Sequence, residues 1–291
     1  MPFGFSRGSG ARRGPMGCNT RLIIALVIAV IGIVGYLSKR SINPVTGEKQ
    51  YVSLSRDQEI ALGLQAAPQM AQQMGGVVPK SDPAASMVQE VGRHIVDSSD
   101  ASKSPYVKSF DFHLLNDDQT INAFALPGGQ IFITRALYGK LENEAQLAGV
   151  LGHEIGHVLH RHAAEHMAKG ELGGMLATAV GVGASDERGG GYGAAVAAQM
   201  ANQVVQLKFS RNDEKESDTF GLRYMAQAGY DPSAMLKVMQ VLQAASKGGR
   251  TPEILATHPA PQDRLDDIDR RIKELFPNGV PPALTGGRAL P

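Results

Sequence analysis

The hydrophobic pattern begins with an uninterrupted apolar run. Residues 22–37 carry no charge and read LIIALVIAVIGIVGYL. As a helix this segment would be about 24 Å long, against a hydrocarbon core of about 30 Å. An uncleaved anchor, a cleaved secretory signal and a buried core helix all fit such a run. The anchor is favoured because the run is apolar on every face and ends in Tyr-Leu-Ser-Lys-Arg rather than a small-x-small cleavage site.

Beyond this run the apolar positions recur mainly with helical spacing. Ser55 and Asp82 are candidate caps at the start of the first two helices, and Pro68 is expected to break or kink the first. Asn143, followed by Gln146, is a candidate cap for the strongest helix. The helices predicted from this pattern cover residues 54–74, 83–97, 143–169, 194–207, 213–228 and 232–246.

Three short segments between the second and third helices have strand character. They cover residues 110–115, 121–126 and 130–134, and Pro-Gly-Gly at 127–129 joins the last two. Short connections with glycine indicate an antiparallel meander, because parallel strands need longer crossovers. The expected fold class is therefore α+β, mainly helical, with a small antiparallel sheet.

The same patterns predict the domain organisation. A mobile plug or lid is expected in the Gly-rich segment 171–193, and its apolar part, 172–182, is too short to span a membrane but long enough to touch one. The expected parts are a basic N-terminal tail at 1–21, a transmembrane anchor at 22–37, a turn-rich linker at 38–52, a main folded domain at 53–276 and a flexible Pro- and Gly-rich tail at 277–291.

Composition and charge narrow the function. With 43% hydrophobic and 20% charged residues, the chain is neither disordered nor a low-complexity fibre. Six of its 29 bases lie in residues 1–40, where no acid occurs, which leaves 23 bases against 28 acids in the remainder. Such a surface argues against nucleic acid as a partner. The N-terminal bases favour a cytoplasmic N-terminus and an exported main domain, although an Arg-rich, acid-free start also suits a mitochondrial address.

One motif carries chemistry: residues 153–157 read His-Glu-Ile-Gly-His. His153 and His157 are four residues apart on a predicted helix, so both imidazoles project from one face and can bind one metal ion. Zinc is the natural choice for nitrogen ligands at an open catalytic site. Glu154 lies beside this face without being a ligand, where a general base could take a proton from an attacking water molecule.

A catalytic zinc site needs a third protein ligand. A metzincin would place it at position 163, which is Ala163, so that class is excluded. Glu214 and Asp218 are four residues apart on another predicted helix; Glu214 could bind zinc while Asp218 orients a ligand histidine. From spacing alone, the alternative is that both belong to a solvated acidic helix face.

The two motifs together resemble metallopeptidase family forty-eight. Its members include the CAAX prenyl proteases, the HtpX heat-shock proteases and the OMA-type proteases, and its pattern pairs H-E-x-x-H with S-R-x-x-E-x-x-x-D. Here the second motif corresponds to residues 210–218, Ser-Arg-Asn-Asp-Glu-Lys-Glu-Ser-Asp. Residues 43–47 and 122–129 are similar to the OMA-like branch, and the similarity runs from about residue 43 to 270.

This resemblance implies a gluzincin fold in which His153, His157 and Glu214 bind one Zn²⁺ per chain, Glu154 is the base and Asp218 holds a ligand. CAAX and HtpX enzymes carry several transmembrane helices, whereas this chain has one convincing span, so it resembles the anchored, water-facing branch. The implied function is a membrane-anchored zinc endopeptidase acting on unfolded or misfolded envelope or membrane proteins, with its catalytic domain in the periplasm. The alternative is a zinc-dependent chaperone or assembly factor that rarely cleaves.

Three further residues are candidates for the cleft. His258 lies in a Pro-flanked Thr-His-Pro stretch that similar proteases also carry. It is expected either to stabilise the oxyanion or to fill the water position on zinc in a resting state, or to be an ordinary loop residue. Asn122 and Ala123 are the expected substrate-binding residues, on an edge strand where an extended peptide could add by backbone hydrogen bonds.

Overall fold

The computed structural model describes residues 18–184, 208–247, 252–259 and 262–291. These residues fall into two compact units, one that contains residues 18–38 and 169–184 and the other that contains the rest of them. The predicted helix at 194–207 and residues 185–193 of the predicted lid lie outside the described residues. Residues 171–184 of that lid are helical rather than irregular.

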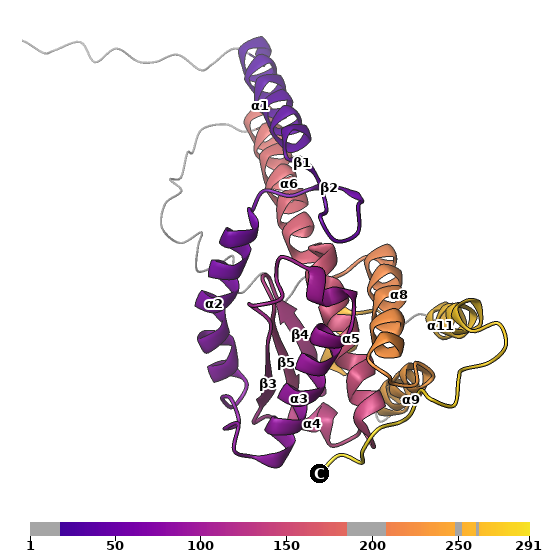
Figure 1. The fold of residues 1–291 in the computed structure, drawn as a ribbon. Helices are drawn as coiled ribbons and strands as arrows, with labels where there is room; N and C mark the ends of the chain where they lie inside the picture. Colours follow the sequence, from indigo (N-terminus) through magenta and orange to yellow (C-terminus); the bar gives the residue numbers. More distant parts are fainter. Residues whose placement is uncertain (1–17, 185–207, 248–251, 260–261) are drawn as a thin grey trace, which may run out of the picture. The chain divides into compact units, whose positions relative to one another are not determined.

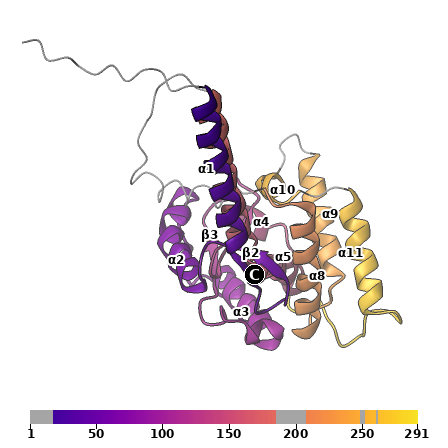
Figure 2. The same cartoon turned by 90° about the horizontal axis from the view of Figure 1, so that it is seen from above.

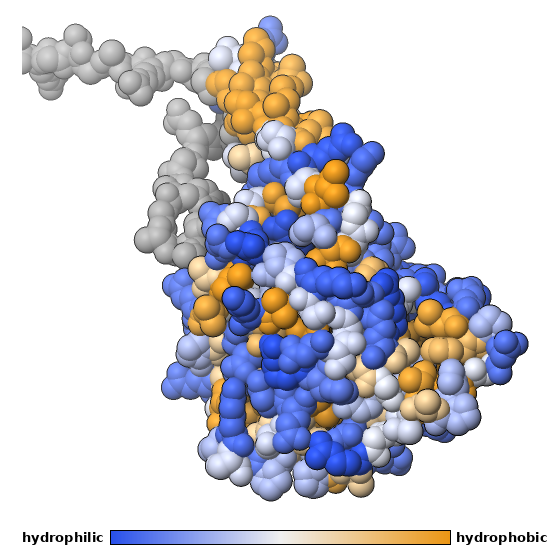
Figure 3. Space-filling view, viewed as in Figure 1, coloured by the Kyte–Doolittle hydropathy of each residue, from blue (hydrophilic) through white to orange (hydrophobic). Residues whose placement is uncertain are grey.

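The first unit contains two helical segments. Helix α1 spans Cys18–Ser38, and residues 19–38 are long and apolar enough to cross a membrane, with 6% of the window buried. Figure 3 shows this surface in orange. The second segment is residues 169–184 of α6 (His162–Ala184). The helices pack closely at Gly32, where an added Cβ would lie 3.2 Å from the Cβ of Met175. One apolar N-terminal helix agrees with the expected anchor but equally with a signal segment.

The second unit is built around a three-stranded sheet. Its strands are β3 (Asp111–Leu115), β4 (Ala123–Leu126) and β5 (Gln130–Thr134), in the order β3-β5-β4. The helices of this unit are α2 (Arg56–Gln73), α3 (Pro83–Ser98), η1 (Asp100–Lys103), α4 (Arg135–Tyr138), α5 (Glu144–His160), α8 (Arg211–Gln227), α9 (Ala234–Ser246), α10 (Glu253–Thr257) and α11 (Gln262–Leu275). The mainly helical fold with a small sheet is confirmed (Figures 1 and 2).

The sheet is mixed, so the expected antiparallel meander is wrong. β4 pairs antiparallel with β5, but β3 pairs parallel with β5, with Asp111 opposite Gln130. The connection from β3 to β5 runs through residues 116–129 and includes β4 itself. This segment is long enough for a crossover connection, so the central strand β5 can run parallel to β3.

Helices cover both faces of the sheet (Figure 1). Met70 of α2 packs against Phe124 and Phe132 on one face, in a smaller apolar cluster. Ile131 and Ile133 point to the other face and join the main core, to which α3, α5, α8 and α9 contribute. This alternation explains why every residue of β5 is buried.

Several predicted elements agree closely with the structure. The side chains of Ser55, Asp82 and Asn143 cap α2, α3 and α5 as expected. Helix α2 continues past Pro68 to Gln73, so of the two predicted effects of Pro68, a break or a kink, the break does not occur. Helices α10 and α11 were not predicted.

The predicted helix at 143–169 is two helices. Helix α5 ends at His160, Arg161 adopts a left-handed conformation with φ 59° and ψ 31°, and α6 begins at His162. The buried carboxylate of Glu59 accepts a 3.0 Å hydrogen bond from Nε of Arg161, and the carbonyl of Leu54 accepts another of 2.7 Å. These contacts hold a conformation that is costly for a residue with a side chain.

The expected linker and tail are ordered parts of the second unit. Residues 40–51 form a hairpin of β1 (Arg40–Ile42) and β2 (Lys49–Tyr51), and Asn43 donates a 2.8 Å hydrogen bond to the carbonyl of Leu159. The predicted flexible tail at 277–291 instead accepts hydrogen bonds from α5: the amides of Glu144 and Ala145 donate to the carbonyls of Arg288 and Gly286, at 3.0 and 2.9 Å. Both segments supply partners for groups that a helix end leaves unpaired.

Candidate metal centre

Helix α5 supplies the His-Glu-x-x-His residues from inside the core. Every residue of α5 is buried. Gly156 lets α8 pack closely, because a Cβ there would lie 2.9 Å from Cα of Ser217. The approach of α8 at this point brings Glu214 and Asp218 to His153 and His157.

Three predicted ligands converge. Nε2 of His153 and Nε2 of His157 are 3.0 Å apart, and the Glu214 carboxylate lies 3.5 Å from the first and 3.4 Å from the second. Tetrahedral ligands at bonds of about 2.0 Å would be separated by roughly 3.3 Å, so these spacings suit a zinc ion. Burial lowers the pKa of His157 well below its usual value, which favours the neutral ligand form.

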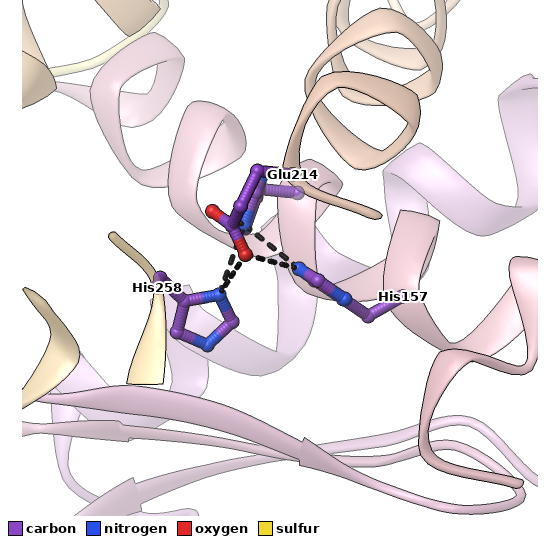
Figure 4. Close-up of side chains that lie close together, drawn as sticks. His157, Glu214 and His258 are labelled. Atoms are coloured by element: carbon purple, nitrogen blue, oxygen red, sulfur yellow. Dashed lines mark hydrogen bonds and ion pairs between the residues drawn. The ribbon is translucent and has the colours of Figure 1, made fainter. Parts of the chain in front are cut away.

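His258, at the end of α10, also faces this group (Figure 4). Its Nδ1 lies 3.0 Å from Oε1 of Glu214 and 3.3 Å from Nε2 of His153. Burial lowers the pKa of His258, but the nearby carboxylates of Glu214 and Glu154 outweigh burial and raise it. The four side chains could together surround one metal ion.

Asp218 lies directly behind His153. Its Oδ1 is 2.9 Å from Nδ1 of His153, the nitrogen opposite the one that faces the group of ligands. Burial raises the pKa of Asp218, but Arg264 and His153 outweigh burial and lower it. An ionised Asp218 can therefore accept the Nδ1–H and leave Nε2 free to bind a metal.

Arg264, on α11, was not among the residues predicted from the sequence. Its guanidinium lies 2.6 Å from Glu214 and donates to both oxygens of Asp218, at 2.7 and 2.8 Å. Arg264 is 7% exposed, and it lies four residues before fully buried Ile268 on the same helix. A charged residue on the apolar face of an amphipathic helix was the signal that could have identified it.

Glu154 is almost completely buried, with 1% of its surface exposed. Among the described residues, neither carboxylate oxygen has a hydrogen-bond partner; the nearest opposite group, Nε2 of His258, is 3.8 Å away. A buried carboxylate without partners is costly unless another group satisfies it. A water molecule beside a metal ion would do so, which fits the role expected of Glu154.

Asn122 and Ala123 lie at the start of the edge strand β4 and are both buried. The carbonyl of Asn122 accepts from the amide of Thr134 on β5, so by alternation the backbone groups of Ala123 and Ala125 face away from β5. Ala125 lines a small pocket together with His157. The Oδ1 atom of Asn122 is buried without a hydrogen-bond partner among the described residues.

A second, mostly apolar pocket opens beside His153, Glu154 and His258. Its apolar walls come from α5, α9 and α10, and Asp218 of α8 and Arg264 of α11 also line it. The apolar lining residues are Val150, Met235, Val238, Met239, Leu242, Ile254 and Leu255.

Comparison with known proteins gives the family. The model for "Peptidase family M48" matches residues 84–272. A β-barrel assembly-enhancing protease of Yersinia pestis is 33% identical over 257 residues, which cover 84% of this chain and 50% of that protein. The Escherichia coli K12 protein of the same name is 32% identical, over 80% of this chain and 48% of its own length. The mitochondrial metalloendopeptidase OMA1 of Saccharomyces cerevisiae is 27% identical, over 78% and 67%.

The chain thus spans about half the length of the bacterial relatives named above. The family match covers the three-stranded sheet, the helix with the His-Glu-x-x-His motif and the helix with Glu214. These findings confirm the family resemblance expected from the two motifs. The chain belongs to peptidase family M48 and is similar to the family's OMA-type proteases.

Proposed function

We propose that one zinc ion per chain is bound by His153, His157 and Glu214, and that the protein hydrolyses peptide bonds at this site. The observation that carries the proposal is the convergence of these three ligand atoms beside Glu154, whose two oxygens lack hydrogen-bond partners among the described residues. A bound zinc ion would polarise the scissile carbonyl and acidify water. The residues around it would orient the substrate and move the protons.

Glu154 is the proposed general base. Its buried carboxylate would take a proton from the attacking water molecule and return it to the leaving amine. Asp218 would keep His153 in the tautomer with hydrogen on Nδ1, and Arg264 would compensate the charge of Asp218 and Glu214. Asp218 and Arg264 are positioning groups for this chemistry.

His258 is proposed to hold the site in a resting state. Its Nδ1 lies within 3.3 Å of atoms of His153 and Glu214, where a fourth ligand would lie, so it would compete with water for this position. Of the two cleft roles considered for His258, this geometry supports the resting ligand over oxyanion stabilisation. Activity would then require displacement of the loop that carries His258.

Substrates are proposed to bind as extended polypeptides. The outward backbone groups of Ala123 and Ala125 could pair with an added strand, which depends little on substrate sequence. Asn122 would use its unpaired Oδ1 to accept a hydrogen bond from the substrate. The pocket lined by Met235, Met239 and Leu242 would accept one apolar side chain next to the scissile bond. Unfolded or misfolded chains expose both features.

The proposed location is a membrane, with α1 as a single anchor, the N-terminus in the cytoplasm and the catalytic unit on the periplasmic side. The length and composition of α1 and the basic N-terminus support this topology. The bacterial relatives are named for enhancing β-barrel assembly, which supports a role in envelope protein quality control. The relationship to mitochondrial OMA1 keeps a mitochondrial inner-membrane location as the alternative.

A second function is an assembly factor that binds unfolded chains and rarely cleaves them. The name of the bacterial relatives and the position of His258 favour it.

The test compares casein cleavage by wild type and by Glu154→Gln at equal measured zinc content. We expect cleavage by wild type and a loss of about 10²- to 10⁴-fold in the variant. If the two are equally inactive with one zinc each, and His258→Ala is also inactive, the hydrolytic proposal fails and the binding function is favoured.

A further inference from the structure

A second group of histidines lies on the Nδ1 side of His157. The proposed mechanism gives these residues no role. The group consists of His160, His162 and Glu216, whose candidate ligand atoms lie within 4.8 Å of one another. His160 and His162 are 0% and 1% exposed. Such a group invites two interpretations: a second metal site, or a hydrogen-bond chain that acts on the first.

The contact between His162 and His157 decides between them. Nδ1 of His162 lies 2.9 Å from Nδ1 of His157, while Nε2 of His162 lies 3.1 Å from Oε2 of Glu216. The hydroxyl of Ser217 is more distant from His162 Nδ1, at 3.4 Å. His162 therefore lies between the outer nitrogen of His157 and a carboxylate.

The tautomers follow from the position of His157. Its Nε2 faces His153 and Glu214, and a nitrogen that binds metal must offer its lone pair. In neutral His157 the hydrogen is then on Nδ1, so Nδ1–H donates to Nδ1 of His162. His162 in turn carries its hydrogen on Nε2 and donates to Glu216.

These tautomers disfavour a second metal ion on His162. Binding through Nε2 would require that His162 carry its hydrogen on Nδ1. That hydrogen would face the Nδ1–H of metal-bound His157 across 2.9 Å, with no acceptor between them. A loaded catalytic site therefore assigns His162 to the hydrogen-bond chain.

The break between α5 and α6 makes this contact possible. In a continuous helix, positions 157 and 162 would be separated by about 140° around the axis, so their side chains would diverge. The left-handed conformation of Arg161 turns the chain so that His162, the first residue of α6, faces back to His157. Glu59 and Leu54 hold Arg161 in this conformation.

We propose that His162 and Glu216 are positioning residues for the zinc ligand His157, through the chain His157 Nδ1–H to His162 Nδ1 and His162 Nε2–H to Glu216. They would fix the ring of His157 and strengthen its Nε2 as a donor to metal. Asp218 would do the same for His153 directly, so each ligand histidine would be oriented from behind by a carboxylate. This inference rests on the proposed zinc site.

The test is the zinc affinity of the full chain in detergent, measured by competition with a chelator, together with the thermal stability of the zinc-free forms. Outer partners of this kind change metal affinity by about 10- to 100-fold. We expect His162→Ala to weaken zinc binding by that factor. His162→Asn should restore part of it, because its amide oxygen can accept at about the position of Nδ1. Glu216→Gln should weaken binding less.

His166→Ala is the matched control. His166 lies on the same helix and pairs with a carboxylate, Asp213, at 2.8 Å, while among the described residues no hydrogen bond or ring contact joins it to His153 or His157. The zinc affinity of the His166→Ala variant should equal that of wild type. The visible spectrum of the Co²⁺-substituted protein should change in His162→Ala and stay unchanged in His166→Ala.

The possible results distinguish failure of the zinc site, failure of the positioning role of His162 and the presence of a second zinc site. If wild type binds no zinc, the proposed metal site itself fails. If wild type binds one zinc and His162→Ala binds it equally well, or loses only zinc-free stability, the positioning role is overturned while the site stands. Two zinc ions per chain, with the second lost in Glu216→Gln, would also overturn the proposal, because they would require the other tautomer of His162.

Discussion

The Nδ1 atom of His258 lies 3.0 Å from Oε1 of Glu214, although 44 residues separate them along the chain. This contact connects the short helix α10 to α8 directly over the proposed ligands. The loop around His258 is thereby coupled to the metal centre, and its position would decide whether a substrate carbonyl can reach that centre.

Replacement of His258 therefore tests the resting state. We expect His258→Ala to raise the turnover of an unfolded substrate several-fold, because a competitor for the water position is removed. The measurement is initial cleavage rate at equal zinc content. A fall in kcat with unchanged zinc affinity would favour an oxyanion role instead, and unchanged turnover and zinc affinity would exclude both.

Arg264 should be essential for the stability of the centre. Arg264→Met would leave the buried carboxylates of Glu214 and Asp218 without a compensating charge, and we expect a loss of about 3–5 kcal/mol in the zinc-free protein. Denaturant unfolding measures it. Arg264→Lys should retain part of the stability but not the paired hydrogen bonds to Asp218. Arg270→Met, on the exposed face of the same helix, is the control, and an equal effect there would refute the assignment.

The lowered pKa of Asp82 predicts that the protein becomes less stable at acidic pH. A hydrogen bond from Arg135 is the main cause that lowers the pKa of Asp82, and the amides of Ala84 and Ala85 lower it further. Because the folded pKa lies below the unfolded one, the stabilisation is present above about pH 4 and is lost as pH falls through the folded value. Asp82→Asn should melt below wild type at pH 6, with the difference shrinking towards pH 3. A constant difference would contradict this.

The edge of β4 offers a test of substrate pairing. The backbone of Ala125 faces away from β5, so proline there would remove an outward N–H without breaking the sheet. We expect Ala125→Pro to raise KM for an unstructured peptide by about 10-fold, with a small change in melting temperature. Ala125→Val keeps the N–H and serves as control. Equal KM values for both variants would argue that substrates do not add to this edge.

Most of the proposed site could be suggested from the sequence, because its residues follow short spacings. His153 and His157 share a helix face by geometry alone, and the family resemblance decided between the two interpretations of Glu214. Arg264 was not predictable in the same way, because its partner Asp218 lies 46 residues away and no local pattern connects them. The position of His162 next to His157 depends on the left-handed conformation of Arg161 between α5 and α6. The sequence gives no sign of this helix break, because the apolar spacing continues through it without a glycine or proline.

Prediction of the fold was likewise reliable only for features that depend on neighbouring residues. Caps such as Ser55 and Asp82 act within three residues and were predicted correctly. The direction of β5 relative to β3 depends on how the chain between them closes over distance, and short spacing suggested the wrong answer. Prediction failed where tertiary contacts, rather than neighbouring residues, determine the conformation.

The contacts at the two ends of α5 have a practical consequence for the choice of fragments of this chain. Its last carbonyls are bound by the hairpin at residues 40–51, and its first amides by residues 286 and 288. A fragment trimmed to 53–276, the limits that the sequence pattern suggests, would retain every proposed zinc ligand yet lose both of these clamps. We therefore expect that a fragment able to fold on its own must extend beyond these limits, and that inactivity of the 53–276 fragment would reflect a loosened scaffold rather than a missing catalytic group.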